Sequence, residues 1–165
     1  MEYFFYGTLM DGDVLARVVG QPVPPARMEA AVVEGYRRLY VADAWYPMLV
    51  PAPGGRVEGR LVSGIDARAA ARIADFENDA YELEALPVRA ARRGAVGALA
   101  FMARPGVAAS PEEWDLASWR RRHKRTYLRL VGVWMTGSRG RAGGGAPSPG
   151  TGRSSRSRRR LPGRL

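Results

Sequence analysis

Short β-rich runs separated by brief turn signals fill the first 136 residues, and this alternation constrains the fold more than any other feature of the chain. Apolar, aromatic and β-branched runs predict strands at 2–6, 28–33, 36–41, 46–50 and 57–65, and a hairpin of 82–91 with 95–102. Pro51, Pro53, Gly54 and Gly55 predict a turn between two of these strands. The pattern favours one small α+β domain.

Only two or three segments have helical character. Asp11 is placed to cap a short helix at 13–19, and Asp66 is placed to cap an alanine-rich helix at 67–76. Ser110 and Glu113 form a capping-box pattern, which predicts the start of a last helical region that runs to about 130. Strands therefore outnumber helices in the expected domain.

The composition excludes several kinds of chemistry. Of the 165 residues, 46% are hydrophobic, which is enough for one core, but there is no cysteine and a single histidine, His123. Disulfides, thiolate zinc sites, cysteine nucleophiles and histidine pairs are therefore ruled out. The chain begins with MEYFFYGTLM, which has an acid where a signal peptide has positive charge, and no apolar run approaches the about 20 residues of a membrane span. We expect a cytoplasmic protein with no membrane partner.

The net charge of +10 comes mainly from the C-terminal end of the chain. Residues 137–165 contain eight of the 26 lysines and arginines and none of the 16 acidic residues. This segment is rich in Gly, Ser, Pro and Arg, so it cannot bury enough apolar surface to offset the entropy of ordering it. We expect a domain at 1–136 and a disordered tail at 137–165. The basic end leaves nucleic-acid association as an alternative, although the tail has no aromatic residue for base stacking.

The first candidate site is Tyr6-Gly7-Thr8-Leu9, directly after an apolar strand. Glycine at the end of a strand lets the backbone turn sharply and approach a ligand closely. The N–H groups that follow it, together with the Thr8 hydroxyl, are donors that can converge on a carboxylate. The motif therefore predicts an anion-binding loop, although a simple turn has the same pattern.

A second candidate lies at the end of the alanine-rich helix, where Glu77 is one of four acids within eight residues. The other three are Asp75, Asp79 and Glu82. A carboxylate at a helix C-terminus lies near the negative end of the helix dipole, and burial against aromatic neighbours such as Phe76 and Tyr81 raises its pKa further. A glutamate whose pKa rises from about 4.3 towards neutrality is suited to transferring protons. Spacing alone does not choose among the four acids.

Three short motifs lie between the two candidates. They are the GY pair at 35–36, YPML at 46–49 and VEGRLV at 57–62. Together with FFYGTL at 4–9 and DFENDAY at 75–81, this series resembles the gamma-glutamylcyclotransferase-like family, also called AIG2-like. The resemblance covers about residues 2–135.

The resemblance implies a compact mixed β-barrel with flanking helices and a pocket at one mouth of the barrel. In the family, the loop that matches Tyr6, Gly7, Thr8 and Leu9 holds the glutamyl moiety, and the glutamate that matches Glu77 is the general acid/base. The family's reaction cyclises a γ-glutamyl amine or amide to 5-oxoproline and releases the amine. Such a ring closure requires neither a metal nor a cofactor. The resemblance places Tyr46 and Tyr81 near the pocket.

Two positions depart from the family pattern. Asn78 stands where the family usually has glycine, and Leu83 stands where members commonly carry arginine. These departures motivate a second interpretation, a non-catalytic small-molecule-binding module with the same fold. The sequence does not identify the γ-glutamyl substrate, the oligomeric state or a role for the tail.

The other residues with chemically versatile side chains have simpler interpretations. His123 lies among arginines and lysine with no carboxylate in its segment, so we interpret it as a surface histidine. Trp114, Trp119, Tyr127 and Leu130 recur at roughly helical spacing, which predicts the packing stripe of the last helix.

Overall fold

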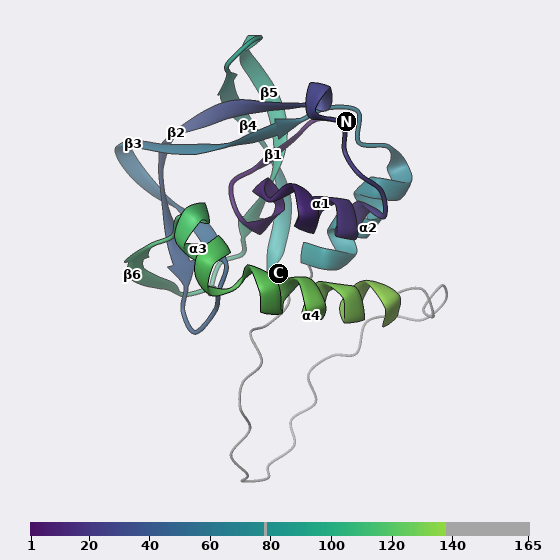
Figure 1. Ribbon diagram of the computed structural model, residues 1–165. Coiled ribbons are helices and arrows are strands. Elements are labelled where there is room, and N and C mark those ends of the chain that lie inside the picture. Colours follow the sequence, from purple (N-terminus) through teal and green to yellow (C-terminus); the bar gives the residue numbers. More distant parts are fainter. Residues whose placement is uncertain (78, 138–165) are drawn as a thin grey trace, which may run out of the picture.

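Five strands close into a mixed barrel in the structure, a computed structural model that describes residues 1–77 and 79–137 (Figure 1). The barrel strands are β1 (Tyr3–Phe5), β2 (Met28–Val41), β3 (Pro47–Val62), β4 (Tyr81–Ala90) and β5 (Gly94–Ala103), and a sixth strand, β6 (Ala109–Glu113), belongs to the same sheet. Their order is β3-β1-β5-β4-β2-β6, and the β2–β3 pairing closes the ring so that β6 extends β2 outside it. β1 and β5 are parallel, and the other pairs are antiparallel. The predicted α+β fold with a compact mixed barrel is confirmed.

The helices gather on one side of the barrel (Figure 1). They are α1 (Gly12–Val19), α2 (Ala67–Glu77), α3 (Leu116–Arg122) and α4 (Lys124–Gly137), with short 3-10 turns at Thr8–Met10 and Pro25–Arg27. The predicted caps are confirmed, because the Asp11 carboxylate accepts the N–H groups of Asp13 and Val14, and the Asp66 carboxylate accepts that of Ala69. Both caps satisfy N–H groups that have no partner inside the helix.

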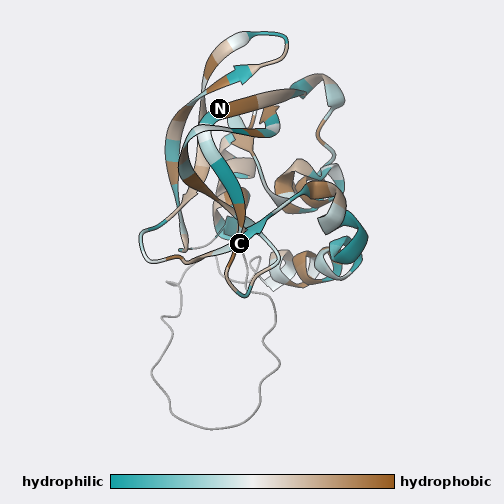
Figure 2. Cartoon of the chain, turned by 90° about the vertical axis from the view of Figure 1, so that its left-hand side faces the viewer, coloured by the Kyte–Doolittle hydropathy of each residue, from teal (hydrophilic) through white to brown (hydrophobic). Residues whose placement is uncertain are grey.

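Two hydrophobic clusters make up the core. One fills the barrel with residues such as Phe4, Val33 and Leu61. The other lies between the barrel and the helices and contains Ile73 and Trp119. Hydrophobic and hydrophilic residues alternate along the strands, as expected where one face of a sheet is buried (Figure 2). The mouth of the barrel that meets the helices is where the candidate residues collect.

The strands between 28 and 62 are longer than predicted. The runs at 28–33 and 36–41 belong to the single strand β2, and the expected turn at Pro51 to Gly55 is wrong, because β3 continues through it. The pairing shifts register there, from Glu34 opposite Arg56 to Tyr36 opposite Pro51, so the prolines and glycines form an irregularity within the sheet. A Cβ atom on Gly55 would lie 2.4 Å from the Tyr36 carbonyl oxygen, which explains why glycine is needed at this close approach.

The predicted capping box at Ser110 and Glu113 is also wrong. Residues Ala109–Glu113 form the edge strand β6, whose pairing with β2 outweighs the local helix signal. The helix cap is Asp115, whose carboxylate accepts the N–H of Ser118. The expected single helix is two, α3 and α4, and the second extends to Gly137 rather than 130.

Gly59 in β3 allows β1 to pack directly on it. A Cβ atom on this residue would lie 2.5 Å from the Phe4 ring and 2.5 Å from the Phe5 carbonyl oxygen. We therefore expect Gly59→Ala to lower the free energy of unfolding by roughly 2 kcal/mol, as overpacking in a tight core does. Urea unfolding measures this, with Gly97→Ala in β5 as the control, because a Cβ atom there meets nothing within 4 Å. Equal stability of the two variants would contradict the packing described.

Of the predicted tail, only Gly137 is described, and it is the last residue of α4; the rest of the tail and Asn78 lie outside the described residues. Within the residues that are described, no helix is long and apolar enough to cross a membrane.

Candidate active site

The last turn of α2 carries Glu77 into the interior of the protein. Ala69, Ile73, Phe76 and Glu77 form the buried stripe of this helix, with the spacing expected for one helical face. Of the four acids in this region, only Glu77 is buried. Asp75 and Asp79 are exposed, and Glu82 is half-buried. Helical periodicity thus separates Glu77 from its neighbours.

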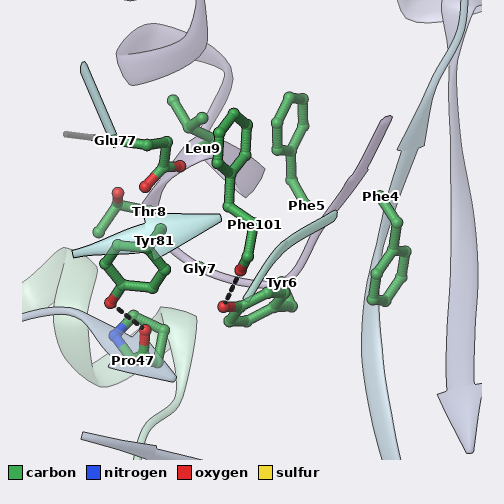
Figure 3. Close-up of a pocket in the computed structure, with 10 residues that line it drawn as sticks. All are labelled: Phe4, Phe5, Tyr6, Gly7, Thr8, Leu9, Pro47, Glu77, Tyr81 and Phe101. Atoms are coloured by element: carbon green, nitrogen blue, oxygen red, sulfur yellow. Dashed lines mark hydrogen bonds between the residues drawn. The ribbon is translucent and has the colours of Figure 1, made fainter. Parts of the chain in front are cut away.

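The environment of Glu77 favours its neutral form. No lysine or arginine among the described residues pairs with its carboxylate, and the side chain points into a pocket between Thr8 and Leu9 (Figure 3). Burial raises the pKa of Glu77 to about 8. A carboxyl group with this pKa exchanges its proton near neutral pH, as a general acid/base must.

The glycine loop, residues 6–9, turns across the mouth of the pocket. Thr8 begins a 3-10 turn in which the Met10 N–H donates to the Gly7 carbonyl and the Asp11 N–H donates to the Thr8 carbonyl. The N–H groups of Gly7, Thr8 and Leu9 donate to no protein acceptor in the part of the chain that the structure describes. Consecutive free N–H groups in a turn form an anion-binding nest.

Close packing against Pro47 explains why residue 7 is a glycine. A Cβ atom on Gly7 would lie 3.1 Å from Cγ and 3.2 Å from Cδ of Pro47, tighter than an ordinary van der Waals contact. Pro47 is itself held, because its carbonyl accepts the Tyr81 hydroxyl at 3.1 Å. The loop therefore lies as close to this wall of the pocket as a residue without a side chain allows.

Tyrosine side chains surround the carboxyl group of Glu77. The Tyr6 hydroxyl donates to the Phe101 carbonyl at 2.5 Å, and the Tyr127 hydroxyl lies 3.4 Å from the Thr8 hydroxyl (Figure 3 shows the first pair). Burial, with the nearby Glu77 as a smaller cause, raises the pKa of Tyr6 and of Tyr46. Tyr46 is buried beside Tyr81, with ring centroids 6.4 Å apart, but does not line the pocket.

The structure brings together all but one of the predicted site residues. The pocket is lined by Phe4, Phe5, Tyr6, Gly7, Thr8, Leu9, Pro47, Glu77, Tyr81 and Phe101 (Figure 3). Its interior volume of about 20 Å³ holds one or two water molecules, so a larger ligand has to widen it. The predicted site residues did not include Phe4, Phe5, Pro47 or Phe101, and the carbonyls of Pro47 and Phe101 each accept a tyrosine hydroxyl.

His123, Leu83 and the aromatic residues predicted to pack in the last helix do not line the pocket. His123 is half-buried and stacks on Trp45 with ring centroids 4.6 Å apart, and Leu83 is exposed. Trp114 precedes α3 instead of belonging to a helix, and the buried stripe of α4 is Tyr127, Val131 and Met135, without Leu130. Within the described ranges, no group of three or more His, Asp or Glu side chains could hold a metal ion.

Comparison with known proteins places these features in a family. The family described as "Gamma-glutamyl cyclotransferase, AIG2-like" matches residues 3–121. AIG2-like protein A of Arabidopsis thaliana is 26% identical over 129 residues, which cover 76% of this chain and 75% of the relative. AIG2-like protein D of the same plant is 24% identical, with coverage of 78% and 84%.

Solved structures show the same fold. The solution structure of At5g39720.1 from Arabidopsis thaliana has a TM-score of 0.58 at 23% identity and covers 83% of this chain and 91% of its own. A structure named gamma-glutamyl cyclotransferase has a TM-score of 0.52 at 11% identity, with coverage of 94% and 93%.

A closed five-stranded mixed barrel with flanking helices is thus the fold of the cyclotransferase-like proteins. The chain belongs to the AIG2-like gamma-glutamyl cyclotransferase family.

Proposed function

We propose that the protein is an enzyme that cyclises a γ-glutamyl amine or amide to 5-oxoproline and releases the amine, with Glu77 as general acid/base. The observation that carries this proposal is the buried carboxyl group of Glu77, with a pKa of about 8, which shares one pocket with the loop that carries the N–H groups of Gly7, Thr8 and Leu9. Family membership supports the reaction class.

The chemistry needs one proton carrier and no co-reactant. The α-nitrogen of the substrate attacks its own γ-carbonyl carbon, the new carbon–nitrogen bond closes a five-membered ring, and the bond from the γ-carbon to the amine nitrogen breaks. Two protons pass from the α-ammonium to the departing nitrogen, which leaves as an ammonium group. The Glu77 carboxylate accepts them from the first nitrogen and returns them to the second. No water is consumed and no enzyme nucleophile is required.

The pocket walls contribute orientation. The free N–H groups of Gly7, Thr8 and Leu9 would hold the α-carboxylate of the glutamyl group, because an anion at such a nest accepts several hydrogen bonds at once. Holding this end fixes the α-nitrogen near Glu77 and folds the chain towards ring closure. Restricting an intramolecular reaction to its reactive conformer contributes a large share of the rate.

The rate should rise as pH increases, as expected for an enzyme that uses a carboxylate as a general base. Because burial raises the pKa of Glu77 to about 8, most of this group is protonated at pH 7 and cannot accept a proton. We expect kcat/KM to rise with pH as Glu77 ionises, with a midpoint near pH 8, and to fall again where the substrate α-ammonium loses its proton, since this parameter reports groups of the free enzyme and the free substrate. Initial rates of 5-oxoproline formation between about pH 6 and pH 10 measure it.

The matched control for this profile is Asp75→Asn, which removes an exposed carboxylate from the same helix and should leave the midpoint unchanged. A profile without a rising limb in this range, as expected for a group with the ordinary glutamate pKa of about 4.3, would count against Glu77 as the base.

A further inference from the structure

Arg38 in β2 is a half-buried cation that pairs with no carboxylate in the described part of the chain. No described acidic group lies within ion-pair distance of its guanidinium. The group stacks over the Trp114 ring instead, 5.1 Å from the centroid. Desolvation of a cation is costly, so its retention at such a position calls for specific acceptors. The neighbouring Arg37 differs, because it is exposed and pairs with the exposed Glu113.

Arg38 donates to backbone carbonyls from three separate segments, and its Nη1 also lies 3.5 Å from the Met10 sulfur. Its Nη1 donates to the Tyr6 carbonyl and to the Glu58 carbonyl, each at 2.9 Å, and its Nε donates to the Trp114 carbonyl at 3.0 Å. The side chain therefore joins the glycine loop to β3 and to the segment between β6 and α3. Rigid, planar donors of this kind fix the orientation of the groups they bind.

The bond to Tyr6 has a direct consequence for the pocket. The peptide group between Tyr6 and Gly7 is planar and trans, so its carbonyl and its N–H point in opposite directions. With the carbonyl held by Arg38, the Gly7 N–H points away from the guanidinium. A cation bound to the carbonyl also polarises the peptide group and strengthens its N–H as a donor.

We propose that Arg38 is a positioning residue that holds the glycine loop, so that the N–H groups of Gly7 and Thr8 are directed at the carboxylate of the ligand. Arg38 does not line the pocket and acts only through the loop. Its kinetic consequence depends on the proposed function, whereas its effect on the loop does not.

The test compares Arg38→Met, which keeps the apolar stem, with Arg38→Lys and with Arg37→Met as the matched control. In amide proton–nitrogen spectra of the full-length protein, we expect Arg38→Met to shift the Gly7 and Thr8 resonances and Arg37→Met to leave them in place.

The kinetic test uses a γ-glutamyl amino acid that the wild type converts. In Arg38→Met, KM should rise about tenfold while kcat changes less than about threefold, as expected for one lost charge-assisted contact to a binding loop. The KM of Arg38→Lys should lie between those of the wild type and Arg38→Met. Millimolar guanidinium should restore part of the lost affinity in Arg38→Met.

Unchanged Gly7 and Thr8 resonances in a folded Arg38→Met variant would overturn the proposal. An equal rise of KM in Arg37→Met would overturn it as well, because loss of surface charge would then explain the effect. If the wild type converts no γ-glutamyl compound, the proposed function fails, and the amide resonances alone decide the role of Arg38. If Arg38→Met does not fold, Arg38→Lys supplies the same two readouts.

Discussion

Replacing Glu77 with Gln is expected to lower kcat for 5-oxoproline formation by about 10²- to 10⁴-fold, the range for losing a general acid/base. The amide keeps the shape of the buried side chain but cannot accept and return a proton. Single-turnover and steady-state rates from quantified 5-oxoproline measure the loss. Asp75→Asn should retain wild-type turnover, since Asp75 is exposed on the same helix.

The same substitution should leave the fold intact and even stabilise it. The folded protein binds a proton at Glu77 that the unfolded chain has already released, so wild-type stability decreases as pH rises from about 4.3 towards the raised pKa of about 8. Gln carries no charge to bury. The melting temperature of the variant should therefore exceed that of the wild type at about pH 8.5 and match it near pH 4. An inactive variant with lower stability at both pH values would point to misfolding instead of lost chemistry.

Asp11→Ala is expected to cost roughly 3 kcal/mol of unfolding free energy, or roughly 10 °C in melting temperature. The buried Asp11 carboxylate caps α1 through one oxygen. Its other oxygen lies 2.7 Å from Arg120 Nε and 3.0 Å from Lys124 Nζ, so the carboxylate joins α1 to α3 and α4. The substitution removes the cap and two charge-assisted contacts together. Thermal and urea unfolding at neutral pH measure the cost.

The control for Asp11 is Asp13→Ala, which removes an exposed carboxylate that pairs with Lys124 and should change stability little. Burial alone would raise the pKa of Asp11, but hydrogen bonds from Arg120 and Lys124 outweigh it and hold this pKa below its usual value. Its stabilising contribution is therefore complete above the unfolded pKa of about 3.9 and is lost as pH falls through the lower folded pKa. A difference between wild type and Asp11→Ala that stays constant down to about pH 2 would contradict the ion pairs described.

Local signals were sufficient for much of the fold. The caps at Asp11 and Asp66 and the β4–β5 hairpin follow from contacts between residues close in sequence, and all three are confirmed. The failures depend on long-range pairing. Pro51 and Gly54 resemble a turn, yet β3 passes through them because β2 is long enough to pair on both sides. Ser110 resembles a helix cap, yet β2 recruits its segment as an edge strand.

In the candidate site, too, local sequence patterns identify some residues, whereas others are brought in only by long-range strand pairing. The glycine loop and Glu77 are recognisable as short motifs, and the spacing from Ala69 through Ile73 to Glu77 would have selected this acid as the buried one. Phe101 and Arg38 carried no local signal. Phe101 reaches the pocket only because β5 lies beside β1, and Arg38 reaches Tyr6 only because the barrel closes.

The most direct test of the proposed reaction is to incubate the full-length wild-type protein with γ-glutamyl amino acids, γ-glutamyl-lysine and glutathione, and to follow 5-oxoproline by mass spectrometry. We expect 5-oxoproline to appear with an equal amount of released amine from at least one substrate, and to be absent with Glu77→Gln. A folded wild-type protein that is thermally stabilised by one of these compounds, yet forms no 5-oxoproline from any, would contradict the enzyme assignment and identify a binding module instead.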